Sequence, residues 1–145
     1  MTLERIAKIL ELKGFTKEQL EIEVKKSKDE LDGEQARLDS MKSAFEKAID
    51  EFNDKQKRGP VKSGDLEIFY KYFQHLKKKI AQQKQVIVKK LVDVDMKQKA
   101  MIEAHKEKRV FEILHDKILQ DEMRETAHNE QKDADFDFVT RSTRK

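Results

Sequence analysis

Apolar residues recur at every seventh position along most of this sequence, on both sides of its only proline, Pro60. Before the proline, the row consists of Leu3, Leu10, Val24, Leu31, Leu38, Phe45 and Phe52. After it, the row continues with Leu66, Phe73, Ile80, Ile87, Val94 and Met101, and a second apolar row interleaves with each of them. Apolar side chains at two positions of a seven-residue repeat, with charge elsewhere, are typical of helices that bury a narrow seam against a partner helix. The sequence therefore predicts an all-α coiled coil.

The two rows also match each other if the chain folds back at residues 57–65, KRGPVKSGD. With Phe52 opposite Phe69, an antiparallel arrangement pairs Ala48 with Phe73, Phe45 with Leu76, Met41 with Ile80, Leu10 with Phe111 and Leu3 with Ile118. The match weakens in the middle, where the seam positions are Lys17, Ser27, Glu34, Gln83 and Lys90, and a shift by one heptad would also align the rows. We therefore expect an antiparallel helical hairpin that closes within one chain.

The charge distribution supports the same pairing. Residues 68–92 contain lysines and no acidic residue, whereas the facing residues 30–54 are rich in aspartate and glutamate. Opposite charges beside a coiled-coil seam set the choice and orientation of the partner helix. Each exposed pair contributes only about 0–1 kcal/mol, so these charges select the arrangement more than they stabilise it.

The expected organisation is a single coiled-coil domain over residues 1–145. Its first helix covers residues 1–57, the turn covers 58–65 with Ser63 or Asp65 as the cap of the second helix, and the paired part of that helix covers 66–118. Residues 119–145 then form an unpaired C-terminal extension whose binding candidates are Leu119, Met123, Ala127, Phe136, Phe138 and Arg141. Because an unpacked amphipathic helix is seldom stable in water, we expect this extension to bind a partner and to fray when alone.

Composition narrows the functional classes. Charged residues make up 42% of the 145-residue chain, which suits a solvated rod better than a compact globule, and there is no cysteine for disulfide or thiolate chemistry. The opening residues MTLERIAKIL lack the uncharged core of a signal peptide, and no apolar run approaches the length of a membrane span. The sequence therefore predicts a cytoplasmic protein without direct membrane insertion.

No motif favours catalysis, so we expect no enzymatic activity, no cofactor and no metal. Glu112 and His115, and Glu125 and His128, have the spacing of di-iron ligands, but the two pairs lie about 20 Å apart on one helix. The aromatic and basic stretch at residues 69–79 could stack on nucleic acid, yet its phenylalanines fall on the seam and its lysines face acids. No nucleic-acid partner is expected. Off the seam near the turn, exposed Ile49 and Tyr72 form either a docking patch or a chance pair.

Specific motifs resemble those of one protein family. After the glycine-containing turn come an aromatic pair, Tyr72 and Phe73, and an L-x-x-x-I spacing from Leu76 to Ile80. A lysine- and glutamate-rich helix follows, and its acidic end reads Lys132, Asp135, Asp137 and Arg141. In order and spacing, these motifs are similar to those of the flagellar export protein FliJ, over nearly the whole chain.

The resemblance implies a function. FliJ-like proteins are antiparallel coiled-coil stalks that insert their terminal ends into the hexameric flagellar export ATPase and contact the cytoplasmic part of the export gate at the other end. Export chaperones are a further implied partner, the location is the flagellar base on the inner face of the cell membrane, and the protein is monomeric when alone. By position, the gate-contacting residues correspond to Phe45, Ile49, Tyr72 and Leu76. Lys79 and Gln83 depart from the residue types expected in that patch.

Other functions remain open at this point. The equivalent stalk of a virulence type III secretion injectisome would have a similar sequence. A coiled-coil holdase chaperone would need strands between its helices, for which the connection around Pro60 is too short. A parallel homodimeric scaffold would use the same heptads, and a monomeric mass in solution would exclude it.

Overall fold

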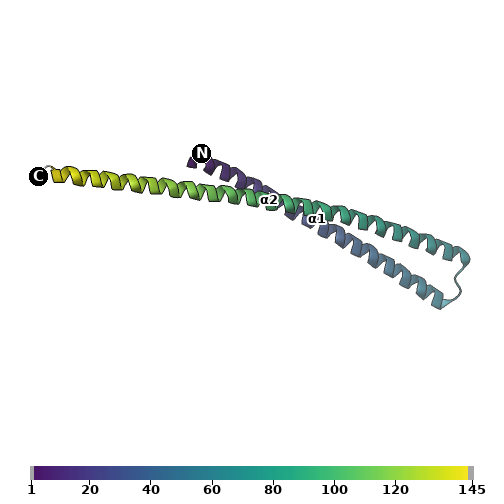
Figure 1. Cartoon of the computed structure of the whole chain (residues 1–145). Coiled ribbons are helices and arrows are strands. Elements are labelled where there is room, and N and C mark those ends of the chain that lie inside the picture. The colour runs from purple at the N-terminus through teal and green to yellow at the C-terminus, as the bar shows by residue number, and fades with distance from the viewer. Residues whose placement is uncertain (1, 144–145) are drawn as a thin grey trace. The chain divides into compact units, whose positions relative to one another are not determined.

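A computed structural model describes residues 2–143, and the described chain consists of two helices, α1 (Leu3–Arg58) and α2 (Ser63–Thr143), shown in Figure 1. Leucine, lysine, glutamate and glutamine dominate both segments, and these residues lose little conformational freedom in a helix. The predicted all-α fold of two long helices packed against each other is confirmed.

The helix ends follow local hydrogen bonding. The hydroxyl of Thr2 accepts a hydrogen bond from the Arg5 amide at 3.3 Å, as an N-cap side chain does. At the other end of α1, Gly59 has a φ of 155°, which side chains rarely allow, and Pro60 follows it. The carbonyl of Lys62 accepts the first bond of α2, from the Leu66 amide at 3.0 Å. The helix therefore begins at Ser63 rather than at residue 66, and Lys62 instead of Ser63 or Asp65 takes the cap position.

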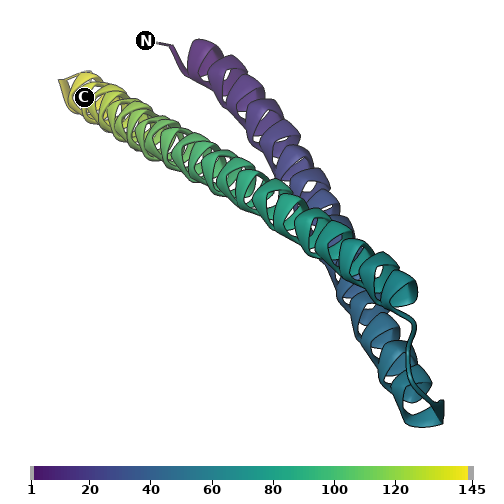
Figure 2. The same ribbon diagram turned by 90° about the vertical axis from the view of Figure 1, so that its right-hand side faces the viewer.

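The chain divides into two compact units that are each built from parts of both helices. We call Leu20–Ala100 the turn unit, because it contains the connection between the helices, which Figure 2 shows in teal and blue. We call Met1–Gln19 with Met101–Lys145 the terminal unit. Both helices pass from one unit into the other without a break in their hydrogen bonding.

In the turn unit, the predicted heptad positions form the interface between α1 and α2. The apolar side chains of Val24, Ala48, Ile87 and Val94 are buried there. Nearer the turn, the rings of Phe52 and Phe69 lie 5.0 Å apart, and those of Phe45 and Phe73 lie 6.0 Å apart. These contacts confirm the predicted opposition of Phe52 and Phe69 and the antiparallel direction.

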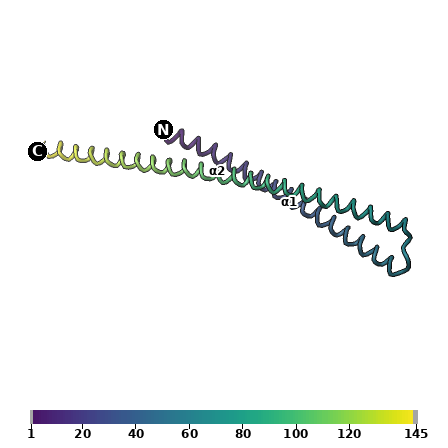
Figure 3. The backbone as a smooth tube through the Cα atoms, turned by 45° about the vertical axis from the view of Figure 1, so that its right-hand side comes forward, coloured from purple at the N-terminus to yellow at the C-terminus, as the bar shows by residue number. Residues whose placement is uncertain are grey.

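In the terminal unit, the first turns of α1 pack against the middle of α2. Ile6 and Ala104 are buried, and the Lys13 ammonium lies 2.8 Å from a Glu107 carboxylate oxygen and 5.8 Å from the centre of the Phe111 ring. Beyond Ile118, α2 continues as a helix to Thr143 with nearly all its side chains exposed. Figure 3 shows this yellow end of α2 extending past the N-terminus of α1. The predicted extension is therefore present, as a continuation of the helix.

Candidate functional site

The four residues predicted at the turn end do not form one exposed surface. Phe45 and Leu76 are half-buried in the helix interface. Tyr72 is 47% exposed, and its ring lies 6.3 Å from that of Phe73. Ile49, predicted to be exposed, is half-buried, and it lies next to the buried seam residue Ala48 in the chain. Tyr72 is therefore the one member of the four that presents a large free face.

An apolar hollow near the turn was not predicted from the sequence. It has a volume of about 490 Å³ and is lined by Phe52, Ser63, Leu66, Glu67, Phe69, Tyr70 and Phe73. Leu66 continues the heptad row and was expected in the seam, yet it is 48% exposed. In the register set by Phe52 and Phe69, the position on α1 opposite Leu66 is Lys55, a polar residue, so the apolar seam ends before it. In the sequence, the four aromatic residues within residues 69–73 were the feature that could have predicted this hollow.

Cationic side chains lie next to this hollow. A second depression, of about 320 Å³, shares Phe69 with it and is lined by Lys55, Arg58, Gly59, Pro60, Val61, Lys62 and Asp65. The Lys55 ammonium lies 4.9 Å from the centre of the Phe69 ring, a cation–π geometry. The turn end can therefore accept a partner that combines apolar side chains with acidic groups.

The residues predicted at the terminal end occupy two separate parts of α2. Leu119, Met123 and Ala127 line one face of the helix together with Glu122, Thr126 and Glu130. Phe136 and Phe138 are 70% and 72% exposed, but a spacing of two residues places them on different sides of a helix. Arg141 is exposed in the last turn, where a cation suits the helix dipole. The structure thus brings together the first three residues and not the last three.

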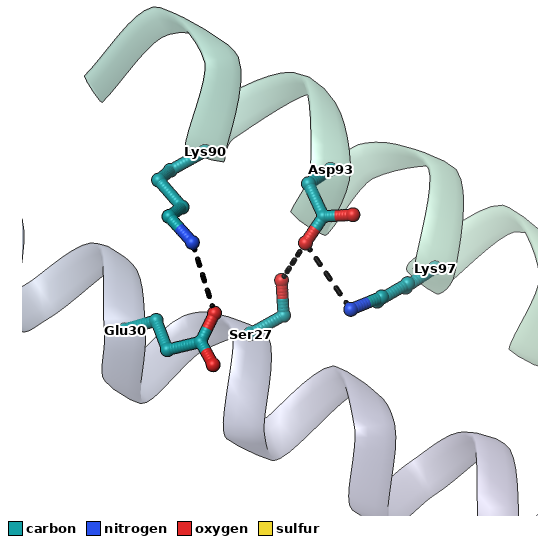
Figure 4. A network of polar contacts seen from close by, with 5 residues as sticks. All are labelled: Ser27, Glu30, Lys90, Asp93 and Lys97. Carbon is teal, nitrogen blue, oxygen red and sulfur yellow. Dashed lines mark hydrogen bonds and ion pairs between the residues drawn. The ribbon is translucent and has the colours of Figure 1, made fainter. Parts of the chain in front are cut away.

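A polar cluster interrupts the seam of the turn unit, as the sequence predicted, and Figure 4 shows its centre. The buried Ser27 hydroxyl donates to the Asp93 carboxylate at 2.8 Å, and Lys97 pairs with the same oxygen at 3.2 Å. Lys90 reaches across to Glu30 at 3.1 Å. Seven residues nearer the turn, about two helical turns, the amide of the buried Gln83 donates to the carboxylate and the carbonyl of Glu34, at 2.6 and 2.9 Å.

These contacts favour the charged forms of two groups. The hydrogen bond from Ser27, followed by that from Lys97, lowers the pKa of Asp93, while the hydrogen bond and charge of Glu30 raise the pKa of Lys90. Both groups are therefore ionised at neutral pH and hold their partners in place. Such a cluster fixes the pairing of the two helices.

The glutamate and histidine that the sequence analysis considered as metal ligands lie beside charged neighbours. Glu112 pairs with Lys108 and Arg109, and His115 lies near Asp116. Within residues 2–143, no three histidine, aspartate or glutamate side chains are grouped as metal ligands. Over the same residues, neither helix has an apolar stretch long enough to span a membrane.

Comparison with known proteins identifies the family. The family described as Flagellar FliJ protein matches residues 2–144, which is almost the whole chain. No curated protein and no solved structure matches this chain. The matched residues include both helices described above. The chain therefore belongs to the flagellar FliJ protein family, whose members are structural components associated with flagellar protein export and not known enzymes.

Proposed function

We propose that this protein is a non-enzymatic stalk of the flagellar type III export apparatus. Its terminal end inserts into the hexameric export ATPase, and its turn end engages the cytoplasmic part of the export gate at the flagellar base. The observation that carries the proposal is the free end of α2, where residues 119–143 are helical, exposed and without a partner segment from α1.

The terminal end has the properties of an insertion element. Leu119, Met123 and Ala127 form an apolar row on one helix face, and Phe136 and Phe138 add two large exposed rings. A single helix is narrow, with a diameter of about 10–12 Å including side chains, so it suits the central opening of a ring. An exposed apolar row gains stability when ATPase subunits cover it.

The turn end has the properties of a docking surface. The apolar hollow and the neighbouring cations Lys55, Arg58 and Lys62 would accept an acidic, partly apolar segment of the gate protein. Exposed Tyr72 extends this surface along α2. Export chaperones are a further class of partner that an apolar surface of this kind suits.

The measurement for the terminal end is the rate of ATP hydrolysis by the purified export ATPase with increasing amounts of the protein. The full chain should stimulate hydrolysis, and a chain truncated after Gln120 should not, although its helices remain paired. Replacing Leu119 and Met123 by serine should raise the concentration needed for half-maximal stimulation about tenfold, because interface anchors contribute about 1 kcal/mol or more each.

The matched control replaces Val110 and Ile113 by serine. These residues are 61% and 54% exposed in the same unit, but they lie outside the extension. The control should stimulate hydrolysis like the unchanged protein. Full stimulation by the truncated chain would contradict the insertion of residues 119–143.

The measurement for the turn end is binding to the purified cytoplasmic domain of the gate protein. Tyr72→Ala should weaken binding about fivefold to tenfold, since exposed tyrosines are frequent anchors at interfaces. Ile22→Ala is the control, because Ile22 is 60% exposed in the same unit but lies on α1 away from the hollow. Equal effects of the two variants would exclude Tyr72 as a gate contact.

A further inference from the structure

An apolar strip lies on the outer face of α2 in the turn unit, apart from the turn end. It consists of Val88, Leu91, Val92 and Met96, which are 53%, 48%, 54% and 65% exposed. The neighbouring seam residues Ile87 and Val94 are buried against α1, so the strip is a second apolar surface of the same helix segment. The outer face of a two-helix coiled coil is normally polar, and four large apolar side chains there leave a surface to be covered.

The spacing makes these side chains neighbours. Val88, Val92 and Met96 follow each other at intervals of four residues, and Leu91 lies three residues after Val88. Residues three and four apart share a helix face, so the four side chains form one continuous strip about two turns long. A ridge of this shape fits the groove of another helix, as in the packing of helices in coiled coils and bundles.

Two lysines without an ion pair among the described residues lie beside the strip. Lys84 precedes Val88 by one turn, and Lys89 precedes Val92 by three residues. The other nearby lysines have acidic partners, since Lys90 pairs with Glu30, Lys97 with Asp93 and Lys99 with Asp95. Within the part of the chain that the structure describes, no ion pair involves Lys84 or Lys89. A partner that covers the strip would therefore meet two positive charges without local neutralisation.

We propose that this strip binds an amphipathic helix of a partner protein, with acidic residues beside its apolar row. The apolar rows pack together, and the carboxylates of the partner pair with Lys84 and Lys89. The contact is independent of the ATPase and gate contacts, because its residues belong to neither end.

Charge selects this occupant. Lys84 and Lys89 have no ion pair among the described residues, and carboxylates on an acidic helix would neutralise both of them. Asp95 is already paired with Lys99 and adds no net charge beside the strip. A second copy of the chain and an anionic membrane surface are the alternative occupants that the test below distinguishes.

The test uses the full chain and two synthetic helical peptides. Both peptides carry the same leucine row in a heptad pattern, with glutamate beside the row in one and lysine in the other. Fluorescence anisotropy should show the glutamate peptide binding about tenfold or more tightly than the lysine peptide, a factor that small charge and packing differences readily supply. Val88→Ser with Val92→Ser should weaken that binding about tenfold, and Lys84→Glu with Lys89→Glu should reverse the preference between the peptides.

Matched controls use the same kinds of change on α1. Ile22→Ser removes an exposed apolar side chain, and Lys25→Glu with Lys28→Glu makes the same change of charge, so both should leave binding within about twofold. Circular dichroism should show that all variants remain helical, because every changed side chain is exposed.

Several results would overturn the proposal. Equal binding of the two peptides, or binding that the valine variants leave unchanged, would show that the strip does not recognise an acidic helix. Light scattering that shows a dimer lost in Val92→Ser would assign the strip to a second copy. Binding to phosphatidylglycerol vesicles with no binding to either peptide would assign it to a membrane surface.

Discussion

Asp93 connects the two helices of the turn unit through a single carboxylate oxygen. That oxygen accepts the hydrogen bond of the buried Ser27 hydroxyl and pairs with Lys97. The two contacts explain both why a serine can lie in an apolar seam and why the pKa of Asp93 is lowered. A buried hydroxyl without this partner would lose the hydrogen bonds that water gives it in the unfolded chain.

We predict a pH-dependent role for this carboxylate. Because the pKa of Asp93 is lower in the folded chain than its ordinary value of 3.8, the folded state binds fewer protons, and the charged form contributes stability above that value. The contribution should disappear as the pH falls through the lower, folded-state pKa. Urea unfolding followed by circular dichroism should therefore show the unchanged protein more stable than Asp93→Asn at pH 7, with the difference vanishing in strong acid.

The matched control for this prediction is Asp95→Asn. Asp95 pairs with Lys99 on its own helix, so its loss should cost less stability at pH 7 than the loss of Asp93. A stability difference between the unchanged protein and Asp93→Asn that stayed constant from pH 7 into strong acid would contradict the assigned role.

Two glycines should respond in opposite ways to the same substitution. Gly33 lies inside α1, and an added Cβ would meet nothing within 4 Å, so Gly33→Ala should raise the free energy of unfolding by about 1 kcal/mol. Gly59 has a φ of 155°, so Gly59→Ala should strain the turn and lower that free energy by about 1 kcal/mol or more. Urea titration of both variants provides the check, and a stabilising Gly59→Ala would refute the described turn.

At the scale of the helices, the polar seam positions select one register. A shift by one heptad would again align the apolar rows, but it would separate Gln83 from Glu34 and Ser27 from Asp93. Buried polar pairs are known to fix register in coiled coils at a cost in stability. The weak centre of the apolar pattern is therefore the part of the interface that specifies the pairing.

Apolar residues at these seam positions should make the fold more stable and its helix register less specific. Replacing both Glu34 and Gln83 by leucine should raise the free energy of unfolding by about 1–3 kcal/mol, because apolar contacts replace half-buried polar ones. The same change should allow a second register, displaced on the order of 10 Å along the helices. Since the chain has no cysteine, spin labels at Glu46→Cys and His75→Cys can report it.

The expected spin-label result is a single distance in the otherwise unchanged protein and two distances in the double leucine variant. Both labelled positions are exposed, so the labels themselves should not disturb the seam. A single distance in the leucine variant would show that the apolar residues alone fix the register.

The sequence predicted the seam well, because burial against one partner helix imposes a fixed repeat that even Ser27 and Gln83 obey. It also predicted the opposition of Phe52 and Phe69. It did not predict exposed Leu66 and the apolar hollow, since a heptad row does not show how the side chains near the turn pack. It also did not predict the half-burial of Ile49, which flanks the seam residue Ala48.

For the residues assigned to the ATPase and to the gate, the sequence predicted both exposure and a partner. The sequence identified exposed apolar side chains at Leu119, Met123 and Tyr72, and the structure leaves each of them at least 40% exposed. An exposed side chain is accessible to a partner, but its exposure does not determine which protein binds it. Their roles therefore stay predictions until binding is measured.

At the scale of the whole molecule, the proposed function depends on two ends with different surfaces. The terminal end offers a single helix with an apolar row, and the turn end offers an apolar hollow beside cations. Helices α1 and α2 each contribute residues to both units. A stalk needs this division, because each end must recognise a different partner.

The most direct test is site-specific photo-crosslinking in a mixture that contains both the export ATPase and the cytoplasmic domain of the gate. The photoreactive residue is placed at position 123 or 136 in one set of proteins and at position 49 or 72 in the other. We predict that positions 123 and 136 crosslink to the ATPase and positions 49 and 72 to the gate. Crosslinks from positions 123 and 136 to the gate, or from both sets to one partner, would contradict the stalk.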